Sequence, residues 1–215
     1  MTKEQLLFQI ANIGYSTSYG RDKCYATSDI ASKGTWRISI FGVYFAILAI
    51  LFPILNTVST IAFLVIGFAV LSLYLRCYTD EKYINAAIKL QAIERKLQNL
   101  YFNVKASDSD LSQYENELKK LDNQQKDIAI SSQVLGSDLY AHIKIFWAKK
   151  INSQWFVDEL KLKFFFDKLP FSFFLLCLLI IILLICLLIA LFISNRLIEI
   201  GYATSLIDLV SKVCK

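Results

Sequence analysis

The side chains best suited to catalysis or metal binding are few in this chain of 215 residues. It has one histidine, His142, and five cysteines, at positions 24, 77, 177, 186 and 214. The cysteine spacing matches neither a metal-ligand motif nor a disulfide framework, and no cysteine or acidic cluster lies near His142 in the sequence. No Gly-rich phosphate loop occurs either. We therefore predict no catalytic residue, no metal site and no cofactor, and we expect a protein that is not an enzyme.

The composition points instead to a lipid environment. Hydrophobic residues make up 56% of the chain and charged residues 19%, whereas a soluble domain usually carries more charge and shorter apolar runs. The net charge of +5 is mildly basic, as expected from topology signals and attraction to anionic lipid. These totals predict an all-α membrane protein whose partner is the lipid bilayer.

One uncharged stretch is long enough for two membrane helices. No charged residue lies between Arg37 and Arg76, and a spanning helix needs about 20 apolar residues. Pro53 and the polar residues after it lie in the middle, where a helix breaker and turn formers suit a hairpin tip. We predict a tight transmembrane hairpin over 38–75, built from helices at 38–55 and 57–75.

Small side chains recur every three or four residues along one face of the first predicted helix, and a second set lies on roughly one side of the other helix. This spacing allows membrane helices to approach closely. Packing within the hairpin explains the pattern, and so does a pore lined by several copies of the chain. The residues of this predicted pore or packing face are Ser39, Gly42, Ala46, Ala49, Ser59, Ala62, Ala69 and Ser72.

The segment 76–136 has the apolar spacing of a coiled coil. Apolar residues follow steps of three and four over 81–104 and again over 111–128, and a polar turn separates the two runs. We predict a cytosolic antiparallel coiled-coil hairpin whose charged outer face, including Glu94, is solvated. The predicted oligomer seam consists of Leu90, Ile93, Leu97 and Leu100.

The remainder of the chain is assigned by composition. Lysines alternate with aromatic residues over 137–169, a pattern found in nucleic-acid binding but more typical of a membrane interface when an apolar run follows. That run, 170–195, is a predicted third transmembrane helix, and 196–215 is a predicted amphipathic tail. The predicted interface anchors are Trp36, Arg37, Trp147 and Trp155.

The distribution of Lys and Arg predicts the orientation. These residues are concentrated in the N-terminal segment 1–37, a predicted cytosolic or interfacial helical segment, and in the central segment, and none lies at the hairpin tip. The positive-inside rule then puts the N-terminus in the cytoplasm and the C-terminus on the opposite, extracytoplasmic side of the membrane.

Several sequence features resemble one known family. They are the run GRDKCYATS at 20–28, the pair Trp36-Arg37, the tight hairpin, and Ala87, Leu90, Ala92, Leu97, Leu100 and Tyr101 after it. Together they resemble the SLATT domain, the SMODS and SLOG-associating two-transmembrane effector, over roughly residues 5–135. The third apolar run departs from the two-span plan of that family.

The resemblance implies a function that the residues alone do not. It implies an effector of a bacterial anti-phage, abortive-infection system that forms a pore or disrupts the inner membrane when a partner activates it. The implied partner is a reverse transcriptase or a nucleotide-signalling enzyme, and the version coupled to reverse transcriptases is the most similar one.

Three classes of function compete at this point. A pore-forming effector requires a homo-oligomer, because two or three helices cannot enclose a water-filled path. A non-conducting membrane scaffold would use its coiled coil to recruit a soluble partner. An intramembrane enzyme is disfavoured, since the predicted spans contain no Asp, Glu, His, Lys or Arg. Direct nucleic-acid binding is not expected.

Overall fold

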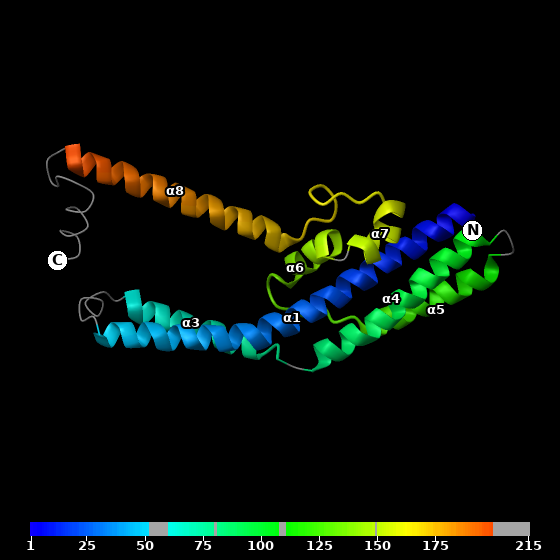
Figure 1. Cartoon of the computed structure of the whole chain (residues 1–215), viewed down its shortest axis with the longest axis horizontal. Helices are drawn as coiled ribbons and strands as arrows, with labels where there is room; N and C mark the ends of the chain where they lie inside the picture. Colours follow the sequence, from blue (N-terminus) through cyan, green and yellow to red (C-terminus); the bar gives the residue numbers. More distant parts are fainter. Residues whose placement is uncertain (52–59, 80, 108–110, 149, 200–215) are drawn as a thin grey trace. The chain divides into compact units, whose positions relative to one another are not determined.

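The computed structural model describes residues 1–51, 60–79, 81–107, 111–148 and 150–199 (Figure 1). The chain divides into two compact units, Met1–Pro170 and Phe171–Lys215. Every regular element in the described ranges is helical. The first unit contains α1 (Lys3–Leu51), α3 (Thr60–Arg76), α4 (Lys82–Ala106), α5 (Ser112–Ile128), α6 (Ser137–Ile143), the π-helix η1 (Lys144–Ala148) and α7 (Lys150–Glu159), and the second contains α8 (Phe171–Glu199).

Helix α1 is the axis of the first unit. It begins with reciprocal capping bonds: the backbone N–H of Gln5 donates to Thr2 Oγ1 (3.3 Å), and the backbone nitrogen of Thr2 donates to Gln5 Oε1 (3.1 Å). No proline interrupts the 49 residues of α1, so the helix passes through the predicted segment boundary at residue 37. It packs against α4, α5, α6 and α7 along its first part and against α3 near its end (Figure 1).

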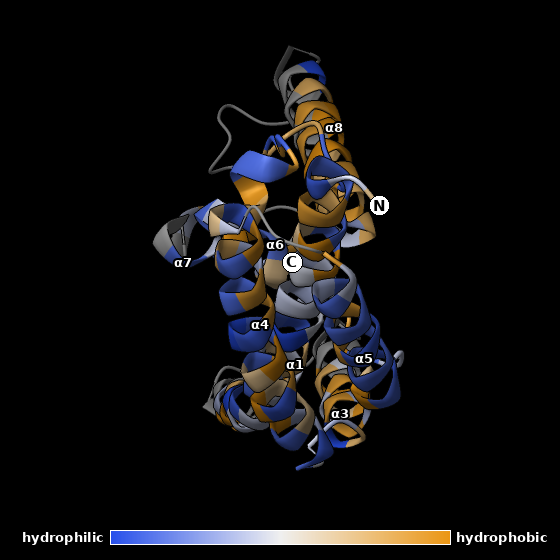
Figure 2. Ribbon diagram, turned by 90° about the vertical axis from the view of Figure 1, so that its right-hand side faces the viewer, coloured by the Kyte–Doolittle hydropathy of each residue, from blue (hydrophilic) through white to orange (hydrophobic). Residues whose placement is uncertain are grey.

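Helices α4 and α5 lie where the apolar spacing predicts two amphipathic helices. The buried stripe of α4 packs on α1, and Leu118 and Leu121 of α5 complete the same core. Leu6 and Ile10 of α1 are fully buried there. Helix α5 is mostly hydrophilic outside this contact (Figure 2). A helix with one apolar face is stabilised mainly by burying that face, so α4 and α5 depend on α1.

A second layer, formed by α6, η1 and α7, covers another side of α1. Gly136 precedes α6 with φ +89°, a left-handed conformation that favours glycine. Phe156 of α7 is fully buried in the core, and Trp155 lies over Gly14 of α1. The hydroxyl of Ser153 donates to the carbonyl of Ile145 in the π-helix (2.8 Å), which supplies a partner for a backbone group.

Helices α1 and α3 pack against each other and approach closely at Gly34. A Cβ added at Gly34 would lie 2.9 Å from Cδ1 of Leu75, so the absence of a side chain there permits the close approach. Leu75 is buried, whereas most of the other described apolar side chains of α3 are exposed.

The structure overturns the predicted membrane-spanning fold class. In the described part of the chain, no helix is both long enough and apolar enough to cross a bilayer. The three predicted spans, 38–55, 57–75 and 170–195, are therefore wrong as membrane-spanning helices. The structure gives no orientation relative to a membrane, so the predicted orientation stays a prediction.

Two of the described apolar segments are shorter than a membrane-spanning helix. The apolar end of α1 stops at Leu51 and α3 has 17 residues, while a spanning helix needs about 20. Helix α8 is strongly apolar (Figure 2). The predicted hairpin tip and most of the predicted tail lie outside the described residues.

The packing of α7 on α1 can be tested at Gly14. A Cβ there would lie 2.9 Å from Cζ2 of Trp155 and nearer still to Cη2. Gly14→Ala should therefore lower the free energy of unfolding by about 1–3 kcal/mol, the usual cost of overpacking, in chemical denaturation followed by circular dichroism.

Gly42→Ala is the matched control. Gly42 lies in the same helix, but no heavy atom lies within 4 Å of a Cβ added there. The control should raise stability by up to about 1 kcal/mol, because alanine favours helix over glycine. An equal gain from both substitutions would contradict the packing of Trp155 on Gly14.

Candidate functional site

A buried ionic network lies between α1 and α4, and its Arg21 and Asp22 belong to the sequence run 20–28. Arg21, Asp22 and Glu94 are 4%, 0% and 8% exposed. The Arg21 guanidinium donates from Nε to Asp22 Oδ1 (3.1 Å) and from Nη2 to Asp22 Oδ2 (2.9 Å). Nη2 also donates to Ser18 Oγ (2.9 Å), and Nη1 forms an ion pair with the Glu94 carboxylate of α4.

The side-chain chemistry suits a buried junction. A guanidinium has five donors in a fixed planar fork, which matches two carboxylates at once. Removing one partner from a buried ion pair leaves an uncompensated charge in a region of low dielectric, which is strongly destabilising. The network therefore ties α4 to one register on α1.

The prediction that Glu94 is solvated is wrong. Glu94 lies on α4 seven residues after Ala87 and seven before Tyr101, and all three side chains are buried. The seven-residue spacing of Glu94 from two buried residues was the signal in the sequence. Spacing could have shown that the carboxylate is buried, but Arg21 as its partner emerges only from the tertiary structure.

The predicted oligomer seam lies inside the chain's own core. Leu90, Ile93, Leu97 and Leu100 are buried, and the last three share a core cluster with apolar residues of α1. Pairing of these residues between copies stays a prediction, and it would require α4 to leave α1.

The predicted pore or packing face is described only in part. Ser39 and Ala69 are exposed, and Gly42 and Ser72 are half-buried. Ser39 donates its hydroxyl to the carbonyl of Thr35 in its own helix (2.9 Å), and the space around Gly42 is open. The side chains of Ala46, Ala49, Ser59 and Ala62 lie outside the described residues. Close helix packing therefore occurs at Gly34, while a Cβ added at Gly42 would meet no described atom within 4 Å.

The predicted interface anchors have different surroundings. Trp36 and Trp147 are 69% and 73% exposed, and Arg37 is also exposed. Trp155 is only 7% exposed, and its ring centroid lies 5.2 Å from that of Tyr101. Three of the four residues are therefore available to an interface, and Trp155 is a core residue.

A tyrosine joins α4 to α7 beside this tryptophan. The hydroxyl of Tyr101 donates to Glu159 Oε2 (2.6 Å). Burial raises the pKa of Tyr101, and the hydrogen bond to Glu159 raises the pKa further. The phenol therefore remains protonated and able to donate across the physiological range.

The histidine is buried in an aromatic setting. The His142 side chain is held by Phe164, whose carbonyl lies 2.9 Å from Nε2, and its ring lies 4.9 Å from those of Phe146 and Phe164. This hydrogen bond assigns the proton to Nε2. No group of three or more His, Cys, Asp or Glu suited to a metal occurs among the described residues. His142 thus positions the backbone of Phe164.

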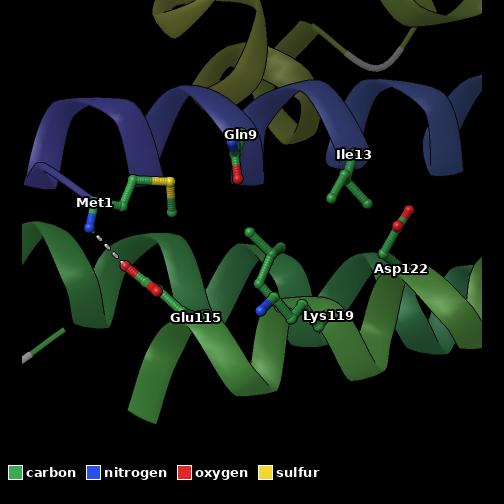
Figure 3. Close-up of a pocket in the computed structure, with 7 residues that line it drawn as sticks. Met1, Gln9, Ile13, Glu115, Lys119 and Asp122 are labelled. Carbon is green, nitrogen blue, oxygen red and sulfur yellow. Dashed lines mark ion pairs between the residues drawn. The ribbon is translucent and has the colours of Figure 1, made fainter. Parts of the chain in front are cut away.

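A groove of about 290 Å³ separates α1 from α5 (Figure 3). Gln9 and Ile13 of α1 face Glu115, Lys119 and Asp122 of α5 across it. The lining carries charges of both signs, and the Met1 nitrogen lies 3.1 Å from Glu115 Oε1. This lining favours no single class of charged ligand.

The comparison with protein families identifies the class. The family described as SMODS and SLOG-associating 2TM effector domain 6 matches residues 1–177. The chain therefore belongs to the SLATT family, and the resemblance seen in the sequence is confirmed over a longer stretch. No curated protein and no solved structure matches the chain.

The family assignment defines a kind of protein rather than a reaction. Its description is that of a two-transmembrane effector domain, which implies membrane localisation and a role in anti-phage systems. The matched range contains the Arg21 network and every described helix of the first unit. The network is thus part of the effector domain itself.

The buried network leads to a prediction about the free energy of unfolding. Arg21→Met removes the guanidinium and leaves Asp22 and Glu94 buried without it. The free energy of unfolding should fall by about 3–5 kcal/mol, measured by chemical denaturation with circular dichroism. Adding Glu94→Leu to Arg21→Met should recover part of the loss, because one buried carboxylate is then removed.

Lys126→Met is the control for charge removal. It breaks the exposed ion pair with Asp122 (2.5 Å), and such pairs contribute at most about 1 kcal/mol. Similar losses for Arg21→Met and Lys126→Met would show that the buried network does not stabilise the fold.

Proposed function

We propose that this protein is the membrane-disrupting effector of a bacterial anti-phage system and is inactive until a partner signals infection. The observation that carries the proposal is the family match over residues 1–177. Abortive infection then follows from loss of the barrier function of the inner membrane in the infected cell.

The partner in this proposal is an enzyme or sensor of nucleotide signalling. The family description names association with SMODS and SLOG domains, which the resemblance links to nucleotide cyclases and nucleotide sensors. A reverse transcriptase is the other proposed partner. Genes adjacent to the coding sequence would distinguish the two, because a neighbouring gene for a cyclase or for a reverse transcriptase would identify the partner and its signal.

The proposed acting surface is the apolar end of α1 together with α3. Large apolar side chains are exposed on both helices, a concentration that is unusual for a surface in contact with water. They are Ile40, Phe41, Val43, Tyr44 and Ile47 on α1, and Val65, Ile66, Val70, Leu71 and Leu73 on α3. Lipid and other copies of the chain are the partners that such a surface favours, so we propose that the active form is a homo-oligomer at the membrane.

A non-conducting scaffold is the second candidate. Helix α5 exposes charged side chains, including Glu117 and Lys120, away from its contact with α1. A soluble partner could bind this face while the chain stays at the membrane. The scaffold and the membrane-disrupting effector differ in whether activation collapses the membrane potential.

The acting surface can be tested at Gly42. Because the space around Gly42 is open within the chain, a larger side chain there should not disturb the fold. In cells that carry the partner, Gly42→Leu should abolish growth arrest and loss of membrane potential after phage challenge, since bulk at a small-residue position keeps helices of neighbouring copies apart. A potential-sensitive dye and colony counts give the readout.

Phe41→Leu is the matched control, because it changes an exposed apolar neighbour into another apolar residue and should keep activity. The amount of each variant in the membrane fraction must equal that of wild type. Full killing by Gly42→Leu would reject the Gly42 face. A wild-type chain that leaves the membrane potential intact while still protecting the culture would favour the scaffold.

A further inference from the structure

A cluster of aromatic rings lies at the end of the first unit, around Phe164. Its ring is parallel to that of Trp147, with centroids 5.7 Å apart and an interplanar angle of 1°. It meets Phe165 edge-on at 4.7 Å and Phe146 edge-on at 5.6 Å. His142 packs on it at 4.9 Å. The rings therefore hold each other in defined positions.

The backbone of the loop after α7 is also held. The carbonyl of Phe164 is bonded by His142, and the N–H of Lys163 donates to Asp167 Oδ2 (2.7 Å). The N–H of Leu162 donates to the carbonyl of Val157 (3.0 Å). Lys161 has φ 52°, which non-glycine residues rarely adopt. These bonds fix the backbone of the loop, and its side chains project from that fixed backbone.

The large side chains that project outward from the loop and from η1 are apolar. Trp147 is 73% exposed, Phe165 62% and Phe166 83%. Two of these rings are fixed by contact with Phe164, so their exposure does not come from a frayed end. Burying three such rings in a partner would release a large apolar area from water.

The exposed charged side chains beside these rings include more lysines than acids. Lys161 and Lys163 are exposed. Of the nearby acids, Asp167 accepts the N–H of Lys163, and Glu159 accepts the hydroxyl of Tyr101. Asp158 is exposed. The two exposed lysines therefore favour an anionic partner.

We propose that Trp147, Lys161, Lys163, Phe165 and Phe166 form a docking surface for an anionic lipid membrane. Aromatic rings settle at the level of the lipid headgroups, and lysines beside them attract anionic phosphate groups. This lipid-docking surface is separate from the Gly42 face, and it depends on the proposed function only in requiring that the chain acts at a membrane. It gives the first unit a second attachment to the bilayer.

The experiment uses the full chain and vesicles of phosphatidylcholine, with or without phosphatidylglycerol. Lipids brominated on the acyl chains quench tryptophan that enters the bilayer, and the difference between wild type and Trp147→Phe isolates the signal of Trp147. We expect quenching of Trp147 that is stronger with phosphatidylglycerol. Phe165→Ser with Phe166→Ser should reduce this quenching roughly twofold or more, and Lys161→Gln with Lys163→Gln should remove the preference for phosphatidylglycerol.

Phe8→Ser with Phe102→Ser is the matched control. Both phenylalanines are about half exposed, on α1 and α4, outside the lipid-docking surface. The control pair should leave the quenching of Trp147 unchanged. Circular dichroism of each variant must match that of wild type, so that a fall in quenching reports lost docking.

Three results would contradict the lipid-docking surface. If the chain sediments with vesicles while Trp147 stays open to aqueous iodide and is not quenched by brominated lipid, docking is wrong and the proposed function stands. If the chain sediments with neither vesicle, the docking surface is wrong, and the proposed function is decided by the membrane-potential assay in cells that carry the partner. Shielding of Trp147 by single-stranded RNA, but not by vesicles, would make the surface a nucleic-acid site.

Discussion

The contact between α1 and α4 is the interaction on which the rest of the first unit depends. It buries the apolar stripe of α4 and places Arg21 between the carboxylates of Asp22 and Glu94. An apolar stripe tolerates small shifts along a helix, whereas a guanidinium with several buried partners tolerates few. The stripe thus supplies most of the stabilisation, and the network selects the register.

The continuity of α1 connects the core to the proposed acting surface. One helix runs from Lys3 to Leu51, and it contributes both to the core and to the exposed apolar end near Gly42. A helix is stiff over this length. A partner that changes how α4 or α5 packs on α1 therefore also changes the position of the apolar end of α1. Under the proposed function, this gives a physical route from partner binding to the membrane.

The fold uses its aromatic residues in two separate ways. Trp155 fills the space above Gly14 and completes the core, while Trp147 stacks on Phe164 and faces outward. Both residues belong to the same basic and aromatic segment. Trp147 belongs to the π-helix η1 and Trp155 to α7, and the hydroxyl of Ser153 in α7 donates to the carbonyl of Ile145 in η1.

The sequence by itself determined the helical class, the positions of α4 and α5 and the family, because these depend on local periodicity and on short runs such as GRDKCYATS at 20–28. It also identified Leu90 and Leu97 as residues that must be covered. Only the tertiary structure decided that α1 covers them, that Glu94 is buried beside Arg21 and that Trp155 lies in the core. Counting apolar residues also predicted three membrane spans, which the described helices do not support. Periodicity shows which face of a helix avoids water, but what covers that face depends on residues far away in the chain.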